Sequence, residues 1–513
     1  MARNRAKAGA SGGWPPAGER SAGVERPERV ESVSRSTKDS DTKLEWSNML
    51  AMLSLRGACA GDLRVSRRRA SIFTDASSQP NKELRFFVWQ QASSVCLDGL
   101  YPLAVQSMNA TQLAFDFPRL PADDFLKEIE GFSLNGKRTL TEYWGNVPYF
   151  FNEFWTAKQR DAHPLHEVSY RACFKPQLPA FFIERLTKPG DKVYDPFMGR
   201  GTTPIQAALM GRYPVANDVN PLSRMLCRPR LNTPTLREID ARLAGLDLVA
   251  DIQGHEDLLA FYHPDTLAEI IGLRRYLIQK DQSGQLDAID DWIRMVAINR
   301  LTGHSPGFFS VYSLPPNQAV TVDRQLRINE QRNQVPSKRD IRKLIAKKSQ
   351  SLLKEGGICV ASDLHVGRSE QTPKIKDASI SLVVTSPPFL DIVQYASDNW
   401  LRCWFAGINA QEVDITIHRN VKGWQEFTHA TLRELTRVVR PRGYIAYEVG
   451  EVRGGKIELD RVVLDAAEGL PLGPVAVLIN DQEFTKTANC WGVSNNKSGT
   501  NTNRIVILER LDG

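Results

Sequence analysis

The chain has few features of a secreted or membrane-bound protein. Its seven cysteines are scattered over 513 residues, with neither a CxxC pair nor a Cys/His cluster at zinc-binding spacing. This pattern excludes a disulfide framework and predicts a reducing compartment, which we take to be the cytoplasm. No stretch approaches the ~20 apolar residues needed to cross a bilayer. The basic opening MARNRAKAGASGGWPPAGER also lacks the apolar core of a secretory signal.

A strong charge imbalance is also missing. The formal net charge of +7 is small for this length, so it permits a polyanionic partner without identifying one. A hydrophobic content of 42% and a charged content of 24% are typical of a soluble globular protein. The length itself exceeds one ordinary core and predicts two or three structural units.

Composition and pattern divide the chain into four parts. Residues 1–107 are rich in Arg, Ser, Gly and Ala with little periodicity, which predicts a disordered extension. We expect the compact chain to begin at Met108, which would then be the functional start. Residues 108–225 and 355–513 alternate strand and helix patterns, whereas residues 226–354 are mainly helical.

The alternating parts predict an α/β fold. KVYDPF reads as a buried strand, TTPIQAALMG as a helix that its first threonine can cap, and YPVAND as the next strand. The strand pattern returns after the insertion in GGICVASD, ISLVVTSPPF, GYIAYEVG, VAVLIND and NRIVILER. We expect a doubly wound, mainly parallel, seven-stranded Rossmann-like sheet, its last strand antiparallel, with a helical insertion that forms a separate lobe.

A glycine turn with two acidic residues indicates a nucleoside-containing cofactor. Gly199 and Gly201 lie between a strand that ends at Asp195 and a helix start, and Asp218 ends the next strand. A dinucleotide site would need G-x-G-x-x-G, but threonines and a proline follow Gly201. A carboxylate at Asp195 would repel a pyrophosphate and attract an ammonium group. S-adenosylmethionine therefore suits the pattern better.

The second motif is TSPPF, which closes the strand ISLVVT. Consecutive prolines in this position are compatible with a simple strand terminator. The alternative is a rigid loop that holds a substrate, and the rest of the chain decides between the two.

Taken together, DPFMGRGTT (195–203) and SPPF (386–389) resemble the cofactor and catalytic motifs of the amino-methyltransferases of DNA. The resemblance covers roughly residues 140–225 and 355–513. The serine version of the catalytic motif is similar to the branch that acts on the N4 position of cytosine. The order of the motifs, with the cofactor motif first, departs from the common arrangement in which the catalytic motif leads.

The resemblance implies a set of site residues and no metal. Asp218 would hold the ribose, Asp363 would end its strand beside the adenine, and the segment 174–176 would close over the methionine end. The implied cofactor-binding residues are Asp195, Pro196, Phe197, Gly199, Gly201, Thr202, Asp218 and Asp363. The implied catalytic residues are Ser386, Pro387, Pro388 and Phe389.

The chemistry of a base amine explains why such a loop is useful. The lone pair of the amine is delocalised into the ring, so acceptors for its N–H groups favour a reactive geometry. Ser386 Oγ and the Pro387 carbonyl are the expected acceptors, preorganised by the prolines. Phe389 would stack on a base flipped out of the duplex. Carbon-5 cytosine methylation is excluded, because none of the cysteines follows a proline.

We therefore expect a site-specific DNA methyltransferase acting on the N4 amine of cytosine. The alternatives are adenine N6 methylation, RNA methylation and a non-catalytic nucleic-acid-binding protein that kept the fold. The expected partner is double-stranded DNA with the target base flipped out, in a cytoplasmic, nucleoid-associated protein. A cognate restriction endonuclease is a second partner to consider.

Three segments have two interpretations each. The insertion is a candidate DNA-recognition lobe, and its basic stretch 337–354 would either follow phosphates or form a solvated helix face. The aromatic residues Phe308, Phe309 and Tyr312 would either probe the duplex or pack the lobe. The Asn-rich stretch 491–504 would contact DNA or form a polar hairpin.

Overall fold

The computed structural model describes residues 122–512, except residues 135, 156–161, 171–172, 315–318, 389, 391–394, 416–417, 453–456 and 482–501. The predicted extension 1–107, Met108, Phe389 and most of the Asn-rich stretch therefore lie outside the described residues. Among the helices that are described, none is both long enough and apolar enough to span a bilayer.

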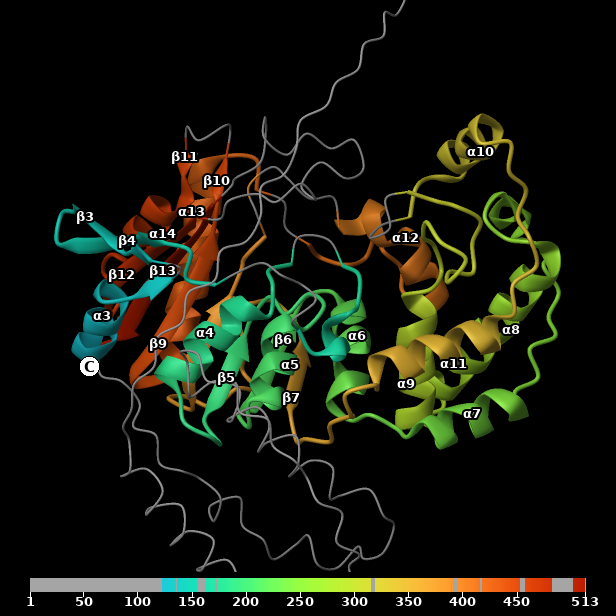
Figure 1. The fold of residues 1–513 in the computed structure, drawn as a ribbon, viewed down its shortest axis with the longest axis horizontal. Coiled ribbons are helices and arrows are strands. Elements are labelled where there is room, and N and C mark those ends of the chain that lie inside the picture. The colour runs from blue at the N-terminus through green and yellow to red at the C-terminus, as the bar shows by residue number, and fades with distance from the viewer. Residues whose placement is uncertain are drawn as a thin grey trace, which may run out of the picture. The chain divides into compact units, whose positions relative to one another are not determined.

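A nine-stranded sheet organises the part of the chain that the structure describes (Figure 1). Its strand order is β3-β4-β12-β13-β9-β8-β5-β6-β7. The strands are β3 (Leu140–Trp144), β4 (Val147–Asn152), β5 (Lys192–Asp195), β6 (Tyr213–Asp218), β7 (Asp363–Val366), β8 (Ile380–Thr385), β9 (Val439–Val449), β12 (Leu472–Asp481) and β13 (Thr502–Arg510). Two small hairpins pair β1 (Ser133–Leu134) with β2 (Lys137–Arg138) and β10 (Glu451–Val452) with β11 (Ile457–Glu458).

The topology confirms the predicted fold class. Strands β9, β8, β5, β6 and β7 are parallel, and β13 inserts antiparallel between β9 and β12. These strands with β12 make the predicted seven. The sheet is wider than predicted because the hairpin β3–β4 adds two strands at the edge, with β4 parallel to β12.

Helices cover both faces of the sheet, and the strands alternate between the two cores. In β8, Leu382 and Val384 belong to the core under α3 (Ala122–Glu130) and α4 (Gln177–Leu186). Val383 points to the opposite core, under α13 (Val421–Val438) and α14 (Leu459–Ala467). All six residues of β8 are buried, as expected for a strand covered on both faces, so ISLVVT shows no polar alternation.

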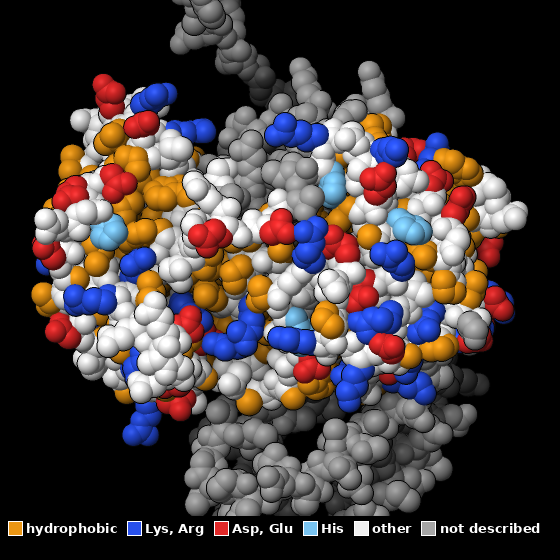
Figure 2. Space-filling model, turned by 180° about the vertical axis from the view of Figure 1, so that it is seen from behind, with side chains coloured by type: hydrophobic (Ala, Val, Ile, Leu, Met, Phe, Trp, Pro, Cys, Tyr) orange, Lys and Arg blue, Asp and Glu red, His pale blue; other side chains and the backbone are white. Residues whose placement is uncertain are grey.

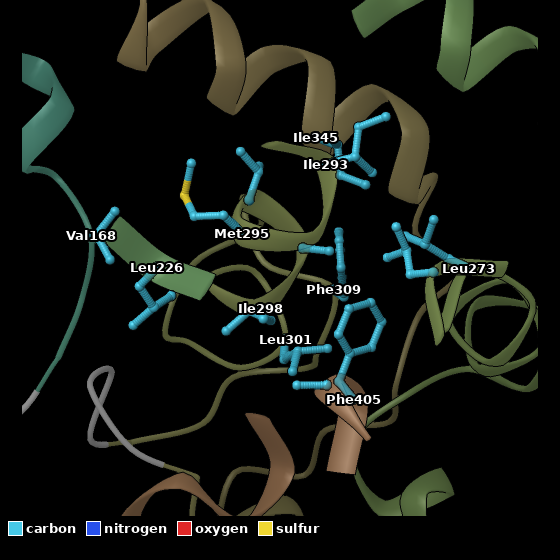
Figure 3. Close-up of a cluster of buried hydrophobic side chains, with 14 of the residues drawn as sticks. Val168, Leu226, Leu273, Ile293, Met295, Ile298, Leu301, Phe309, Ile345 and Phe405 are labelled. Atoms are coloured by element: carbon cyan, nitrogen blue, oxygen red, sulfur yellow. The ribbon is translucent and has the colours of Figure 1, made fainter. Parts of the chain in front are cut away.

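The insertion is helical, but it does not form a lobe with its own core. Its helices are α7 (Leu236–Gly245), α8 (Pro264–Gln282), α9 (Ala288–Ile298), α10 (Val322–Gln331) and α11 (Ile341–Leu352). Figure 3 shows Leu226 of α6 (Pro221–Leu231) and Phe405 of α12 (Tyr395–Ala406) packed among insertion side chains. The expected boundary at residue 226 therefore falls inside α6, and the insertion shares one core with the α/β part.

The aromatic and basic segments of the insertion are largely structural. Phe309 is fully buried, and Phe308 is buried below the Arg300 guanidinium, so both pack the insertion as the second interpretation predicted. In the basic stretch, Arg342 donates to the carbonyls of residues 243 and 246. Lys348 pairs with Glu167 at 2.8 Å. These cations are occupied within the protein.

The helix after the glycine turn, α5 (Thr202–Leu209), begins and ends at glycines in the left-handed region. The N-cap is Gly201, with a φ of 83°, and not the threonine that the sequence predicted. Gly211 follows the helix with a φ of 73°. Gly201 also packs closely, because a Cβ built there would lie 2.7 Å from Cys227 Sγ. The turn thus requires glycine for its backbone conformation and for its packing.

Replacing Gly201 with alanine should destabilise the fold more than replacing Gly211. Both substitutions place a Cβ on a left-handed residue, which costs about 1–2 kcal/mol. At Gly201 the clash with Cys227 adds to that cost, whereas nothing lies within 4 Å of the position at Gly211. Chemical denaturation of the two variants measures the difference in free energy of unfolding.

The double variant Gly201→Ala/Cys227→Ala is the control for the clash. Removing the sulfur should recover part of the loss caused by Gly201→Ala, so that the remaining loss approaches that of Gly211→Ala. Equal losses for Gly201→Ala and Gly211→Ala would show that the contact with Cys227 has no energetic weight.

Candidate active site

A cleft lies at the carboxyl ends of the central parallel strands, as ligand sites do in doubly wound folds. It holds about 860 Å³ of empty space, including its opening to solvent. Its lining comes from Tyr170, Cys173 and Phe174, from the loops after β5, β6, β7 and β8, from residues 414–415, and from Phe427 of α13. The lining residues are Tyr170, Cys173, Phe174, Asp195, Phe197, Met198, Gly199, Thr202, Asp218, Val219, Asn220, Arg368, Ser369, Glu370, Ser386, Pro388, Asp414, Ile415 and Phe427.

The two sequence motifs meet in this cleft and are joined directly. Thr385 Oγ1 donates a hydrogen bond of 2.6 Å to Asp195 Oδ1, which links the end of β8 to the end of β5. Thr203 Oγ1 donates to the Val384 carbonyl at 2.9 Å. Each motif thus contributes a threonine that holds the other motif, and the cofactor motif and the SPPF loop are fixed relative to one another.

Asp195 is the most deeply placed carboxylate in the cleft. Its residue is 1% exposed, and the Phe197 amide donates to the same oxygen that accepts from Thr385. Burial raises the pKa of Asp195 to about 7, and the nearby charge of Asp218 acts in the same direction. A cation placed beside this carboxylate would reverse that shift, so the group is suited to bind a positively charged part of a ligand.

Asp218 holds the glycine turn in place. Its Oδ2 accepts from the Gly199 amide at 2.8 Å, and its Oδ1 accepts from the Asn220 amide at 2.8 Å. Burial raises its pKa even though both amide hydrogen bonds oppose the shift. Each carboxylate oxygen has a second lone pair, so a ribose hydroxyl can still bind there. The sequence predicted only the ligand role and missed the structural one.

Two buried arginines fix the turn from behind. Arg200 donates from Nη1 to the Val168 carbonyl at 3.1 Å and from Nη2 to the Phe174 carbonyl at 3.2 Å. Arg230 donates to the carbonyls of Leu165 and Arg200 and is fully buried. Burial lowers the pKa of Arg230 to about 10. The segment 165–174, which forms one wall of the cleft, is therefore attached to the glycine turn by guanidinium groups.

The structure corrects the expected position of Asp363. The sequence analysis placed it at the end of its strand, beside the adenine, but Asp363 begins β7 and pairs in register with Val215. There it accepts from the Tyr213 hydroxyl at 3.1 Å and pairs with Lys192 at 3.5 Å. It is not among the residues that line the cleft. The carboxylate that follows β7 into the cleft is Glu370.

Ser386 is connected to a buried acid that the sequence analysis did not select. Its side chain lies near Glu448, close to the end of β9, and lowers the pKa of that acid, and Asn503 Nδ2 of β13 donates to Glu448 Oε1 at 2.7 Å. Glu448 is 5% exposed, and burial raises its pKa. The sequence signal was present, because GYIAYEVG places one acid in an otherwise apolar strand.

The two prolines of the SPPF loop lie in different environments. Pro388 lines the cleft and Pro387 is buried. The Pro388 carbonyl accepts from Trp424 Nε1 at 2.9 Å, and Trp424 on α13 is fully buried. The loop is thus fixed by covalent stiffness and by a buried donor. Phe389, the remaining predicted catalytic residue, is outside the described residues.

Aromatic rings form the apolar side of the cleft. Phe197 lies 5.8 Å from Phe427 between ring centroids, and Phe427 lies 4.8 Å from His418. Pro196, which precedes Phe197, does not line the cleft, whereas Thr202 does and accepts from Arg200 Nε at 3.1 Å. Flat apolar groups and carboxylates therefore face the same space.

These groups fit S-adenosylmethionine. The buried Asp195 suits its ammonium group, Asp218 and its neighbours suit the ribose, and the aromatic side chains suit the flat adenine. The turn at Gly199, with a φ of 48°, lets the chain pass close to a ligand beside Tyr170. When bound, the cofactor would supply an electrophilic methyl group.

Comparison with solved structures gives low structural similarity. TrmN from Thermus thermophilus matches with a TM-score of 0.26 and 12% identity, covering 66% of this chain and 50% of that one. A geranyl diphosphate C-methyltransferase from Streptomyces coelicolor matches with a TM-score of 0.27 and 9% identity, covering 66% and 78%.

Sequence comparison is more specific. The profile of the DNA methylase family of N6 and N4 methyltransferases matches residues 112–222, which contain the cofactor motif. A curated relative, the type II methyltransferase M.MjaII of Methanocaldococcus jannaschii, is 32% identical over 82 residues. That match covers 16% of this chain and 16% of the relative, so the chain spans about a sixth of the curated relative that it matches. These matches support an S-adenosylmethionine-dependent amino-methyltransferase of DNA over the part of the chain that contains the cofactor motif.

Proposed function

We propose that this protein transfers a methyl group from S-adenosylmethionine to the exocyclic N4 amine of cytosine in a short DNA sequence. The observation that carries the proposal is that Asp195 and Ser386, from motifs far apart in the sequence, line one cleft and are held together by the bond between Thr385 and Asp195. The cleft gives a cationic methyl donor and an amine acceptor adjacent sites. Proximity of this kind supplies a large part of a transfer rate.

The SPPF loop would bind and activate the amine. Ser386 Oγ and the Pro387 carbonyl accept the two N–H groups, which directs the nitrogen lone pair toward the methyl donor. The hydrogen bond between Pro388 and Trp424 keeps the loop from rearranging when the substrate enters. Preorganised acceptors of this type contribute most when they need no reorganisation during the reaction.

Glu448 would orient the Ser386 hydroxyl group and would accept a proton from it. When Glu448 is ionised, Ser386 donates to it and keeps its lone pairs available for the amine. The nitrogen must lose a proton once the methyl group is bound, and the pair Ser386–Glu448 offers a path from the cleft to a buried carboxylate. The raised pKa of Glu448 makes it a better proton acceptor than an exposed glutamate.

We propose cytosine and not adenine as the target base because the catalytic motif begins with serine, which is similar to the motif of the N4-cytosine branch. The test is to incubate the protein with cofactor and DNA, digest the DNA and identify the methylated nucleoside by mass spectrometry. N4-methylcytosine is the expected product. N6-methyladenine as the product would show that the target base is adenine. Methylation of RNA alone would show that the substrate is RNA. Binding of the cofactor without any methyl transfer would leave only a binding function.

The partners belong to the same proposal. The substrate is double-stranded DNA with the target cytosine flipped out, since the amine in a stacked duplex cannot reach a cleft of this depth. We place the protein in the cytoplasm with the nucleoid, where a cognate restriction endonuclease would share its recognition sequence.

Cofactor affinity should increase as the pH rises through about 7, because the ionised form of Asp195 binds the ammonium group and its pKa in the free protein is about 7. Below that pH the carboxyl must first lose its proton, which weakens binding by up to about tenfold per pH unit. Calorimetry between about pH 5 and 7.5 measures this slope. Asp195→Asn keeps the acceptor for Thr385, so it should bind more weakly with a flat profile; a wild-type slope in that variant would assign the titration to another group.

Ser386→Ala should keep cofactor affinity and lose methyl-transfer rate. The substitution removes one acceptor from the amine, and by analogy with the loss of one preorganised group the rate should fall on the order of 10²-fold. Single-turnover assays with saturating cofactor measure the rate, and calorimetry checks the cofactor site. A wild-type rate would mean that SPPF is only the end of a strand.

Glu448→Gln should reduce the transfer rate and change its pH dependence. In the wild type the rate should fall as the pH drops through the raised pKa of Glu448, because the protonated acid no longer accepts a proton. The variant has no such titration, so the fall of the rate at low pH, which is the acidic limb of the pH–rate profile, should disappear. Asn503→Ala is the matched variant, since it removes only the second partner of Glu448 and should keep the acidic limb. An unchanged limb in Glu448→Gln would reduce the residue to a packing role.

A further inference from the structure

A second concave surface lies on the insertion, between α10 and the loop before it. We call it the α10 groove; its lining residues are Tyr312, Leu314, Thr321, Asp323, Arg324, Arg327, Ile328, Gln331 and Arg332. Three arginines and one aspartate give it a net charge of 3 − 1 = +2. The aspartate is in the first turn of α10, where the helix dipole already favours a negative charge.

The arginines of the groove are available to a ligand. Arg324, Arg327 and Arg332 are exposed, and none forms an ion pair within the part of the chain that the structure describes. Only Arg332 has a contact of its own, with its guanidinium 3.7 Å above the Tyr312 ring. Two basic residues near the start of α11 differ, since Lys338, before the helix, and Lys343, in its first turn, pair with carboxylates at 2.8 and 3.1 Å.

The groove is rigid because buried amides anchor α10. Gln325 is fully buried and donates to the Tyr312 carbonyl at 3.0 Å. Asn329 Nδ2 donates to the Ala260 carbonyl at 2.7 Å, and Gln334 also donates to Tyr312. The outer face of the helix contributes little to this packing, and Leu326 there is 52% exposed. A helix held by amides, with arginines and an aliphatic side chain outside, has a surface suited to a partner.

The groove is connected to the catalytic side of the molecule. The Val320 carbonyl, one residue before the N-cap of α10, accepts from Trp400 Nε1 at 3.2 Å. The Ala319 amide donates to the Asp398 carbonyl. Both partners are on α12, which follows the SPPF loop. Figure 1 shows α10 and α12 toward the side where β9 runs into β10, which is the side of the carboxyl ends of the parallel strands.

Figure 2 shows Lys and Arg side chains interspersed with Asp and Glu side chains over the face seen from behind. Such mixed charge does not favour a polyanion over other solutes. The α10 groove instead combines a net positive charge, concavity and a link to the active site.

We propose that the α10 groove binds the phosphodiester backbone of duplex DNA beside the target base. This assignment rests on the proposed function for the identity of the substrate. Arg324 and Arg327 each contact a phosphate, and Arg332, held over Tyr312, is oriented for a third. The groove takes the role that the sequence analysis offered to the basic stretch 337–354, in which Arg342 and Lys348 are used inside the protein.

The test compares two double variants that each remove two positive charges from the insertion. Arg324→Ala/Arg327→Ala changes the groove, and Lys338→Ala/Lys343→Ala changes exposed, ion-paired lysines near the start of α11. Fluorescence anisotropy with a labelled duplex measures affinity at several salt concentrations. The groove variant should bind about tenfold or more weakly, and its slope of log K against log salt should fall by roughly 0.9 for each lost phosphate contact. The lysine variant should stay close to wild type.

Calorimetry of cofactor binding should give wild-type affinity for both variants, which shows that the fold and the cofactor site are intact. Unchanged DNA affinity in the groove variant, or an equal loss in the lysine variant, would overturn the assignment. Loss of affinity for an RNA duplex but not for DNA would do the same. The proposed function fails separately, if the wild type binds DNA through the groove but transfers no methyl group to it.

Discussion

One short hydrogen bond joins the two halves of the candidate active site. Thr385 and Asp195 are 190 positions apart in the sequence, and the whole helical insertion lies between them. The insertion must therefore return the chain to the sheet at a position where β8 can pair with β5. Its shared core with α6 and α12 meets that requirement, since apolar packing on both sides of the insertion fixes where the chain leaves the sheet and where it returns.

Acids shielded from solvent lie in the cleft and near Ser386, which lines it. Asp195, Asp218 and Glu448 all have raised pKa values because burial disfavours their charged forms. Each is held by donors from a different element, which keeps the cost of burial below that of an unpaired charge. A fold would not need three such groups for its stability. Acids with raised pKa values that lie close together are typical of functional sites, and these three suit the cationic ligand and the proton release that we propose.

Much of the fold and part of the site could be predicted from the sequence. The strand of β8 was readable because all of its residues are apolar or small, and the motif residues around Gly199 and Ser386 were readable because their spacing is unusual. Asp363 was misplaced for a physical reason. The apolar residues Ile358 and Val360 before it were taken for the strand, but they pack against the core of the insertion and bridge to the end of α6, and the strand starts only at Asp363.

Other features depend on tertiary contacts that no local pattern encodes. The bond from Trp424 to the Pro388 carbonyl brings α13 to the SPPF loop, and nothing in the sequence around residue 424 indicates it. The basic stretch was ambiguous for the same reason, since only the structure shows that Arg342 faces the carbonyls of α7 and its following loop. Charge alone did not distinguish a bound cation from an available one.

The antiparallel insertion of β13 has a consequence for synthesis of the protein. The cofactor motif and its supporting arginines are complete once the chain has passed residue 230, but Asn503, which donates to Glu448 near Ser386, is on β13, which comes last in the sequence among the strands that the structure describes. β13 also supplies both neighbours, β9 and β12, with their central hydrogen bonds. A chain released by the ribosome before residue 502 would lack the strand that lies between β9 and β12, so each of these strands would lose a hydrogen-bonded neighbour.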